Sequence, residues 1–189
     1  MSNVASPFGL RPAYHPSGVI RNEAGTITTG YASNIFQHSP IAIVADGSIQ
    51  LAAAAARALG SFLGVEWTDT DGRRRVSNKW TASTAGTSIV AYYTRDQNIV
   101  YEIQSSATLA QADIGSQANW TANNTGSGNT TTGLSNIALD QATLTNVGNA
   151  GLRILGLAPD MDNAFGDTFV NVYVQIAQHQ DVADRVAYG

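Results

Sequence analysis

Residues 168–178 carry the pattern that most constrains this chain, a strict two-residue alternation of side chains. Val170, Val172, Val174 and Ile176 occupy every second position, and the residues between them are mixed in polarity. Because successive side chains of a strand point to opposite faces of a sheet, the alternation predicts a β-strand with one buried face. We expect this strand to be central to the hydrophobic core.

Shorter apolar segments separated by turn residues fill much of the remaining chain. Three candidate turns lie between such segments, at residues 45–48, 69–72 and 95–98, and each is expected to join a pair of strands. The first two contain Asp-Gly, a strong hairpin signal between alternating apolar residues. Residues 52–58 are alanine-rich but brief, and we interpret them as a short helix or a loop. About eight strands without a long amphipathic helix predict an all-β fold, either a single β-barrel or a β-sandwich domain.

Composition divides the chain into three parts. We expect an extended N-terminal arm with short β pieces at residues 1–38, a β-rich domain at 39–179 and an exposed C-terminal tail at 180–189. Within the domain, residues 119–133 consist almost entirely of Asn, Thr, Gly and Ser. That composition cannot bury enough apolar area to organise itself, so it predicts a long exposed polar loop.

The N-terminal arm is Pro-rich. Residues 7–18 contain three prolines, each of which fixes its own φ and favours an extended predecessor. The segment also carries apolar side chains, among them Phe8, Leu10 and Tyr14, that an isolated coil would leave in water. We expect these side chains to dock on this protein or on a neighbour.

Charge excludes several functional classes. Only 13% of the residues are charged, the formal net charge is −4 and the pI is about 5.1, whereas nucleic-acid binding needs a clustered basic face. The dense basic run, residues 73–75, follows acidic turn residues and is interpreted as a solvated or ion-paired hairpin. We therefore expect no nucleic-acid partner. The sequence also predicts neither a membrane span nor a secretory signal, and it contains no cysteine.

No catalytic motif is evident, and we expect no enzyme activity and no cofactor. His15, His38 and His179 lack a second ligand at helical spacing, and no Gly-x-Ser-x-Gly elbow accompanies a serine. The acidic segment 160–167 is the best candidate for a cation site, although a plain loop is favoured. A hydrolase that uses this segment is retained as a minor alternative.

Several short segments, taken together and in order, resemble a known family over most of the chain. They are Phe8-Gly9-Leu10-Arg11-Pro12, the run 98–104, Asp113-Ile114-Gly115, the block 152–157 and the segment 162–167. The family comprises structural proteins of tailed bacteriophages that act as capsid cement or decoration proteins. Its members are β-rich, non-enzymatic proteins that bind the outside of the expanded shell.

The resemblance implies a partner, a location and contact residues. The partners would be the major capsid protein and further copies of this chain, with a homotrimer favoured over a dimer. The protein would be made in the host cytoplasm and located on the capsid exterior, in the virion. The residues expected to contact the capsid are Phe8, Leu10, Arg11, Pro12, Tyr14 and His15.

A tail-associated or glycan-binding β module is the main alternative. It is suggested by Trp67, Trp80 and Trp120 together with the Asn/Thr-rich tract, because aromatic faces and amide hydrogen bonds suit sugars. Tryptophans that simply fill a β core are the more ordinary interpretation.

Overall fold

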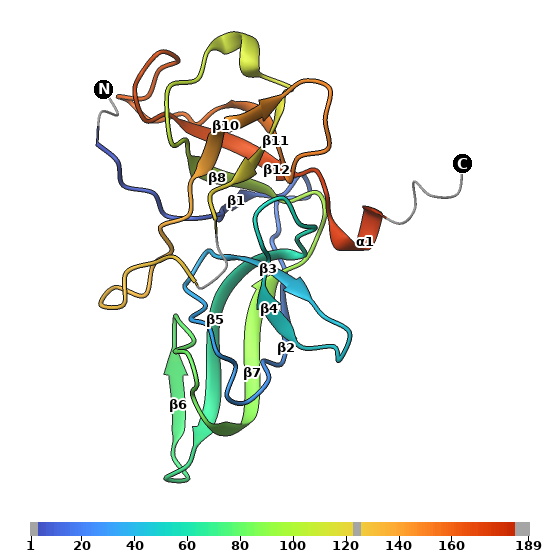
Figure 1. Cartoon of the computed structure of the whole chain (residues 1–189), viewed down its shortest axis with the longest axis vertical. Coiled ribbons are helices and arrows are strands. Elements are labelled where there is room, and N and C mark those ends of the chain that lie inside the picture. Colours follow the sequence, from blue (N-terminus) through green and yellow to red (C-terminus); the bar gives the residue numbers. More distant parts are fainter. Residues whose placement is uncertain (1–3, 123–125, 184–189) are drawn as a thin grey trace.

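The computed structural model describes residues 4–122 and 126–183, and the chain there is almost entirely β-structure (Figure 1). Within these residues, twelve strands form two antiparallel sheets of six strands each. The all-β prediction is therefore confirmed. The helices of the same residues are single turns, η1 (Gln111–Asp113) and α1 (Gln180–Ala183), and neither has the length or apolarity to cross a membrane.

The upper sheet of Figure 1 contains the first strand of the chain and most of its second half. Its strands, in spatial order, are β1 (Arg11–Tyr14), β8 (Val100–Gln104), β12 (Asn171–Ile176), β11 (Leu152–Leu157), β9 (Gln117–Trp120) and β10 (Leu139–Thr145). A bridge between Ser105 and Leu139 brings β10 back to the end of β8, so the sheet curls around its core.

The lower sheet is built from the intervening part of the chain. Its strands, in spatial order, are β2 (Asn22–Gly25), β7 (Gly86–Thr94), β5 (Gly60–Asp69), β3 (Pro40–Ile43) and β4 (Ile49–Leu51), and β6 (Arg74–Ser77) pairs with β5. The outer parts of β5, β6 and β7 project as a ribbon away from the upper sheet (Figure 1). The two sheets pack together and neither forms a closed barrel, which favours the sandwich.

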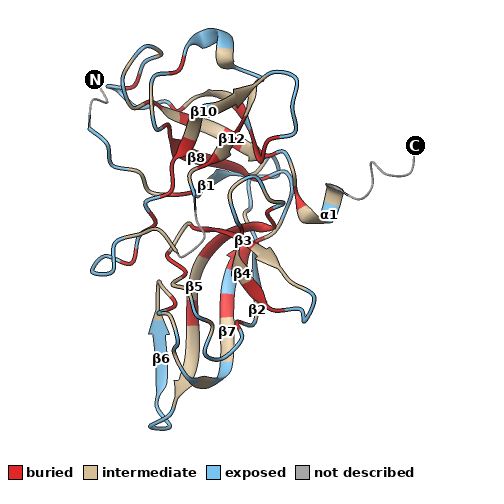
Figure 2. Cartoon of the chain, viewed as in Figure 1, coloured by how far each residue is buried: buried red, intermediate tan, exposed pale blue. Residues whose placement is uncertain are grey.

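Each sheet encloses its own group of buried apolar side chains (Figure 2). In β12, Val172, Val174 and Ile176 are buried, and Asn171 and Tyr173 on the other face are half-buried. The predicted alternation is therefore confirmed. The strand is also central, because β8 and β11 pair with its two edges.

The predicted turns have different outcomes. Residues 45–48 connect the antiparallel pair β3 and β4, and residues 69–72 connect β5 and β6, so both hairpins are confirmed. The hairpin prediction at residues 95–98 is wrong, because β7 and β8 belong to different sheets. Residues 52–58 form turns and bends, so the loop interpretation is confirmed and the short helix is not.

The N-terminal segment is part of the fold and not a separate arm. Its two strands, β1 and β2, pair with β8 and β7 in different sheets. Leu10 is fully buried in the upper core. The Leu10 amide donates to the His38 carbonyl at 2.8 Å, and the Ser61 hydroxyl donates to the Leu10 carbonyl at 2.6 Å. A predicted extended segment has thus found its partners within the same chain.

The polar tract 119–133 is more ordered than its composition suggests. Asn119 and Trp120 belong to β9, and Trp120 is fully buried. The amide of Gln37 donates to the Gly133 carbonyl at 2.9 Å, and the Asn78 side chain donates to the Thr132 carbonyl at 2.9 Å. The prediction of an exposed loop is therefore wrong for residues 119–120 and for buried Gly133, whereas residues 129–132 are exposed as expected, and residues 123–125 lie outside the described chain.

The predicted C-terminal tail begins inside the fold. Gln180 opens α1, and its backbone amide donates to the Ala58 carbonyl at 2.9 Å. The prediction of an exposed tail is therefore wrong at its first residue, and residues 184–189 lie outside the described chain.

Candidate partner-binding surface

β1 places the predicted contact residues along one edge of the upper sheet. Arg11 lies opposite Glu102 of β8, which in turn lies opposite Tyr173 of β12. The register shifts between Pro12 and Tyr14, as at a β-bulge. Strict alternation would turn Tyr14 to the same face as Pro12, and the extra residue turns it to the outer face beside Arg11 instead.

The charged part of this face is built around Arg11. Its guanidinium pairs with the Glu102 carboxylate, and its Cζ lies 4.7 Å from the centre of the Phe8 ring. The Glu102 side chain is only 10% exposed, whereas that of Arg11 is 48% exposed. A carboxylate removed from water to this extent depends on its cationic partner. Arg11 therefore pairs with Oε2 of Glu102 and presents charge to solvent, while Oε1 of Glu102 is buried without a hydrogen-bond partner among the described residues.

The aromatic part of the face is a pair of tyrosines. The rings of Tyr14 and Tyr173 meet edge to face, with centroids 5.5 Å apart and planes at 83°, which is a favourable aromatic geometry. Tyr14 remains 46% exposed. Burial, followed by the charge of nearby Glu102, raises the pKa of Tyr173. We call Phe8, Arg11, Tyr14, Glu102 and Tyr173 the outer strip.

Two of the predicted contact residues point elsewhere. Leu10 is a core residue, so its assignment as a capsid contact is wrong. Pro12 is half-buried and lies opposite Tyr101, on the face away from the outer strip. The strand geometry of β1 sets the direction of both side chains. A prediction of an extended arm, based on its prolines, does not say which face each side chain occupies.

His15 lies beyond β1 and faces the turn between the two sheets. Its Nδ1 accepts the Ser17 amide at 3.0 Å, so the proton of the neutral ring is on Nε2, which lies 3.4 Å from Asp96 Oδ1. Hydrogen bonding from the Asn98 amide is the main cause that lowers the pKa of Asp96. His15 thus fixes the end of the N-terminal segment and lies beside the outer strip, not within it.

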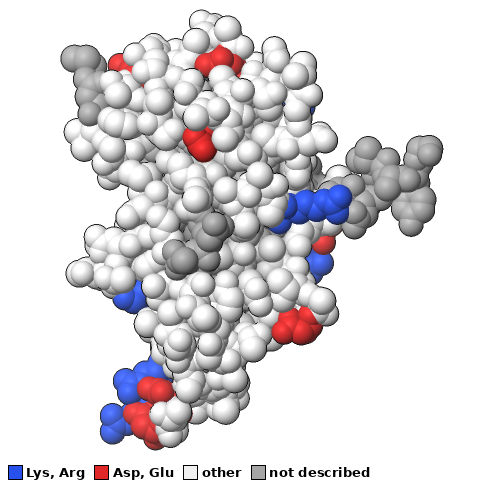
Figure 3. All heavy atoms as spheres, in the orientation of Figure 1, with Lys and Arg blue, Asp and Glu red and all other residues white. Residues whose placement is uncertain are grey.

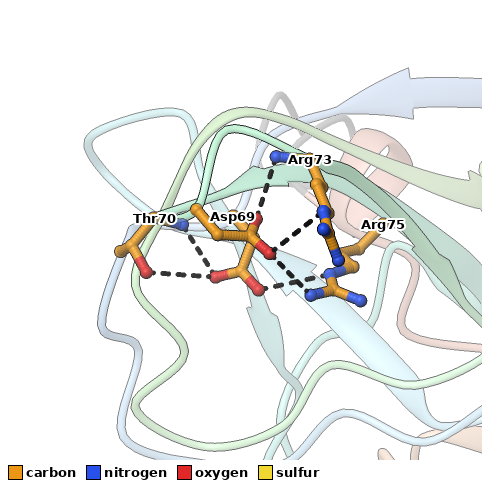
Figure 4. A network of polar contacts seen from close by, with 5 residues as sticks. Asp69, Thr70, Arg73 and Arg75 are labelled. Atoms are coloured by element: carbon orange, nitrogen blue, oxygen red, sulfur yellow. Dashed lines mark hydrogen bonds and ion pairs between the residues drawn. The ribbon is translucent and has the colours of Figure 1, made fainter.

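The basic hairpin is neutralised by its own carboxylates (Figure 4). Arg75 pairs with Asp69 at 3.2 Å and with Asp71 at 3.0 Å, and Arg74 pairs with Glu66 at 3.0 Å. The ion-paired interpretation of residues 73–75 is confirmed. Such exposed pairs contribute little stability, and they leave no excess of positive charge for a polyanion.

The acidic segment 160–167 folds back on its own chain. Asp167 Oδ2 accepts the Ala164 amide at 3.1 Å, and Asp160 Oδ2 accepts the Asn171 side-chain amide at 3.2 Å. Buried Asn163 holds the loop by donating to the carbonyls of Ala158 and Asn171. Among residues 4–122 and 126–183, no group of three His, Asp or Glu side chains is placed to hold a metal ion.

The tryptophans do not form an exposed aromatic surface. Trp80 and Trp120 are fully buried, and the half-buried Trp67 packs edge to face on Trp80 with ring centroids 5.8 Å apart. The core interpretation of these residues therefore holds for Trp80 and Trp120. It removes the aromatic platform on which the glycan alternative depended.

Sequence reasoning missed two members of the outer strip, Glu102 and Tyr173. The alternation in residues 168–178 does place Tyr173 on the non-core face, but it does not indicate which strand lies beside it. Comparison of the chain with protein-family models, with curated proteins and with solved structures finds no match, so the geometry of the outer strip and the resemblance in the sequence are what support a function.

Proposed function

We propose that this protein is a non-enzymatic structural component of a tailed-phage particle that binds the outer surface of the expanded capsid. It would connect neighbouring subunits of the major capsid protein, acting as a homo-oligomer, with a trimer favoured over a dimer. The observation that carries the proposal is the outer strip. An exposed tyrosine and an arginine are held there on a sheet by neighbouring side chains, and both residue types are enriched at the centres of protein interfaces.

Two further features support a bridging role. The outer strip lies at the β1 edge of the upper sheet, and the ribbon of β5, β6 and β7 projects away from the upper sheet (Figure 1). A body with distant ends can reach more than one subunit of a shell, and repeated weak contacts add through multivalency. Most of the surface seen in Figure 3 is uncharged, which suits contacts made through shape and neutral polar groups.

The test is rebinding of the purified protein to expanded, undecorated shells. Tyr14→Ala should reduce shell occupancy by at least tenfold, whereas Tyr92→Ala, which truncates an exposed tyrosine of the lower sheet, should leave it unchanged. Circular dichroism checks that both variants are folded. Equal occupancy by wild type and Tyr14→Ala would contradict the assignment of the outer strip. Localisation of the chain in the tail would replace the capsid proposal with the tail-module alternative.

A further inference from the structure

The last described residues of the chain form a crossing segment between the two sheets. After β12, the amides of residues 177 and 178 still donate to the Gly151 carbonyl beside β11, and residues 179–182 then run along the lower sheet and the loop before β5. Gln180 anchors this segment twice, because its side-chain carbonyl accepts the Ile43 amide at 2.8 Å and its side-chain NH2 donates to the Ile43 carbonyl at 2.9 Å. The backbone pairs with Ala58 on both sides, through Gln178 and Gln180, at 3.1 and 2.9 Å.

His179 lies at the centre of this segment and is only 2% exposed. Its Nδ1 accepts the amide of Asp181 at 3.2 Å, so the ring is neutral with its proton on Nε2. Nε2 is buried without a hydrogen-bond partner among the described residues. A proton added to Nδ1 would point at the Asp181 N–H, so this arrangement accepts only the neutral ring.

The charged groups around His179 do not create a site for an imidazolium. Asp181 is the nearest carboxylate, but Arg95 donates to both of its oxygens, at 2.9 and 3.2 Å. His179 also lines a hollow of about 360 Å³ whose other charged residues are Arg21, Glu23, Arg95, Asp96 and Asp181. Burial is the main cause that lowers the pKa of His179, and the charge of Asp181 and the backbones of Arg95 and Leu59 offset it only in part.

We propose that residues 177–182 form an acid-releasable strap, which neutral His179 latches to the lower sheet and which protonation of His179 releases. The latch works because three anchors lie within four residues of one another: the Gln180 side chain on Ile43, the Asp181–Arg95 ion pair and the His179–Asp181 hydrogen bond. Protonation removes the last of these anchors and would leave a charged ring buried, which is costly in free energy. Release would uncover Ala58 and Leu59, which are buried in the closed state.

The direction of the pH effect follows from the preference for the neutral ring. The closed strap holds a ring whose pKa is below the ordinary imidazole value of about 6.5, whereas the released ring returns to that value. The stability of the closed strap is therefore complete above about pH 6.5 and decreases as the pH falls. One proton is taken up on opening, so the open population rises by up to about tenfold for each pH unit below about 6.5.

Hydrogen exchange of the full-length protein, measured by NMR between pH 7.5 and 5 and corrected for intrinsic rates, tests the strap. The backbone amides of Gln180 and Asp181 should lose up to about tenfold protection per pH unit below about 6.5, while amides of β12 keep theirs. His179→Asn supplies an acceptor at the Nδ1 position without a titrating group, and should abolish this pH dependence. His38→Asn removes a half-buried histidine elsewhere in the chain and should leave this pH dependence intact.

A second measurement covers the case in which His179→Asn fails to fold. In the wild type, the ¹⁵N shifts of the His179 ring report its tautomer and its titration directly. The proposal expects the Nε2–H tautomer at pH 7.5, and it expects the loss of amide protection to track the titration of His179. Unchanged protection of Gln180 and Asp181 while His179 titrates would overturn it, and so would equal pH dependence in His179→Asn. Neither result depends on capsid binding.

Discussion

The phenol oxygen of Tyr101 lies 2.9 Å from Oγ1 of Thr94, and this contact joins the upper sheet to the lower sheet. Thr94 ends β7 and Tyr101 lies in β8, and both side chains are buried. The same Thr94 Oγ1 accepts the amide of Ser61 at 3.0 Å. Two buried hydroxyls and a backbone amide of β5 thus form one satisfied network at the junction of the sheets.

Tyr101→Phe should lower the free energy of unfolding by about 1–2 kcal/mol, because it leaves the buried Thr94 hydroxyl without its partner. Urea denaturation followed by tryptophan fluorescence measures the change. Tyr92→Phe is the matched control. The exposed Tyr92 hydroxyl donates to Glu66 at 2.8 Å, and its loss should change stability by no more than about 0.5 kcal/mol. Equal effects of the two substitutions would contradict a special role for the junction.

Alkaline pH should destabilise the protein through the same residue. Burial raises the pKa of Tyr101 well above its ordinary value, so the folded state keeps a proton that the unfolded chain releases above about pH 10. The free energy of unfolding should therefore fall as the pH rises above about 10. The decrease should be shallower in Tyr101→Phe, and parallel curves for wild type and variant between pH 9 and 11 would exclude this explanation.

Gly60→Ala should be strongly destabilising. A Cβ at Gly60 would overlap the backbone carbonyl of Thr94, which cannot move without shifting β7. We expect a loss of about 3 kcal/mol or more. Gly156→Ala is the control, because a Cβ at Gly156 in β11 meets no atom within 4 Å, and it should change stability by at most about 0.5 kcal/mol. Thermal melts of both variants decide the comparison.

Arg11→Ala should destabilise the protein by about 1–3 kcal/mol, since it leaves the largely buried Glu102 carboxylate without its cation. Adding Glu102→Gln should recover part of the loss, because a neutral amide is less costly to bury than an unpaired charge. Chemical denaturation of the single and double variants measures the recovery. A double variant less stable than Arg11→Ala would show that Glu102 contributes through other contacts.

Replacing residues 126–133 with a Gly/Ser linker should cost more than a surface change, by about 1 kcal/mol or more. The replacement removes the Asn129 side chain, whose Oδ1 accepts the amides of Thr131 and Thr132 at 2.8 and 3.1 Å, and so loosens the turn whose backbone carbonyls accept from Gln37, Asn78 and Lys79. Differential scanning calorimetry measures the loss. A melting temperature unchanged from wild type would support the free loop that composition alone suggested.

The sequence predicted elements well where the signal was local. The alternation in β12 and the Asp-Gly turns at residues 45–48 and 69–72 depend on neighbouring residues, and the strands and hairpins followed. Residues 95–98 also separate two apolar segments, yet the chain passes there from one sheet to the other. Partner strands are chosen by contacts far apart in sequence, and no local pattern reports them.

The candidate surface was likewise predictable only in its local part. Phe8, Arg11 and Tyr14 were identifiable as residues of a segment that needs a docking surface. Their neighbours in the outer strip, Glu102 and Tyr173, lie on β8 and β12, so they become visible only when the register of the sheet is known. The burial of Leu10 depends in the same way on strands that occur late in the chain.

The order of strands along the chain also determines when the protein can begin to fold. β1 pairs with β8 through an Arg11–Glu102 contact that spans 91 positions, and the Gln180 contacts with Ile43 span 137 positions. During synthesis, the first strand must therefore wait, unpaired, until the whole lower sheet has left the ribosome. The strands of the lower sheet all lie within residues 22–94, whereas the upper sheet combines β1, which precedes that range, with strands that follow it. Contacts of this sequence range slow folding and favour a single cooperative transition.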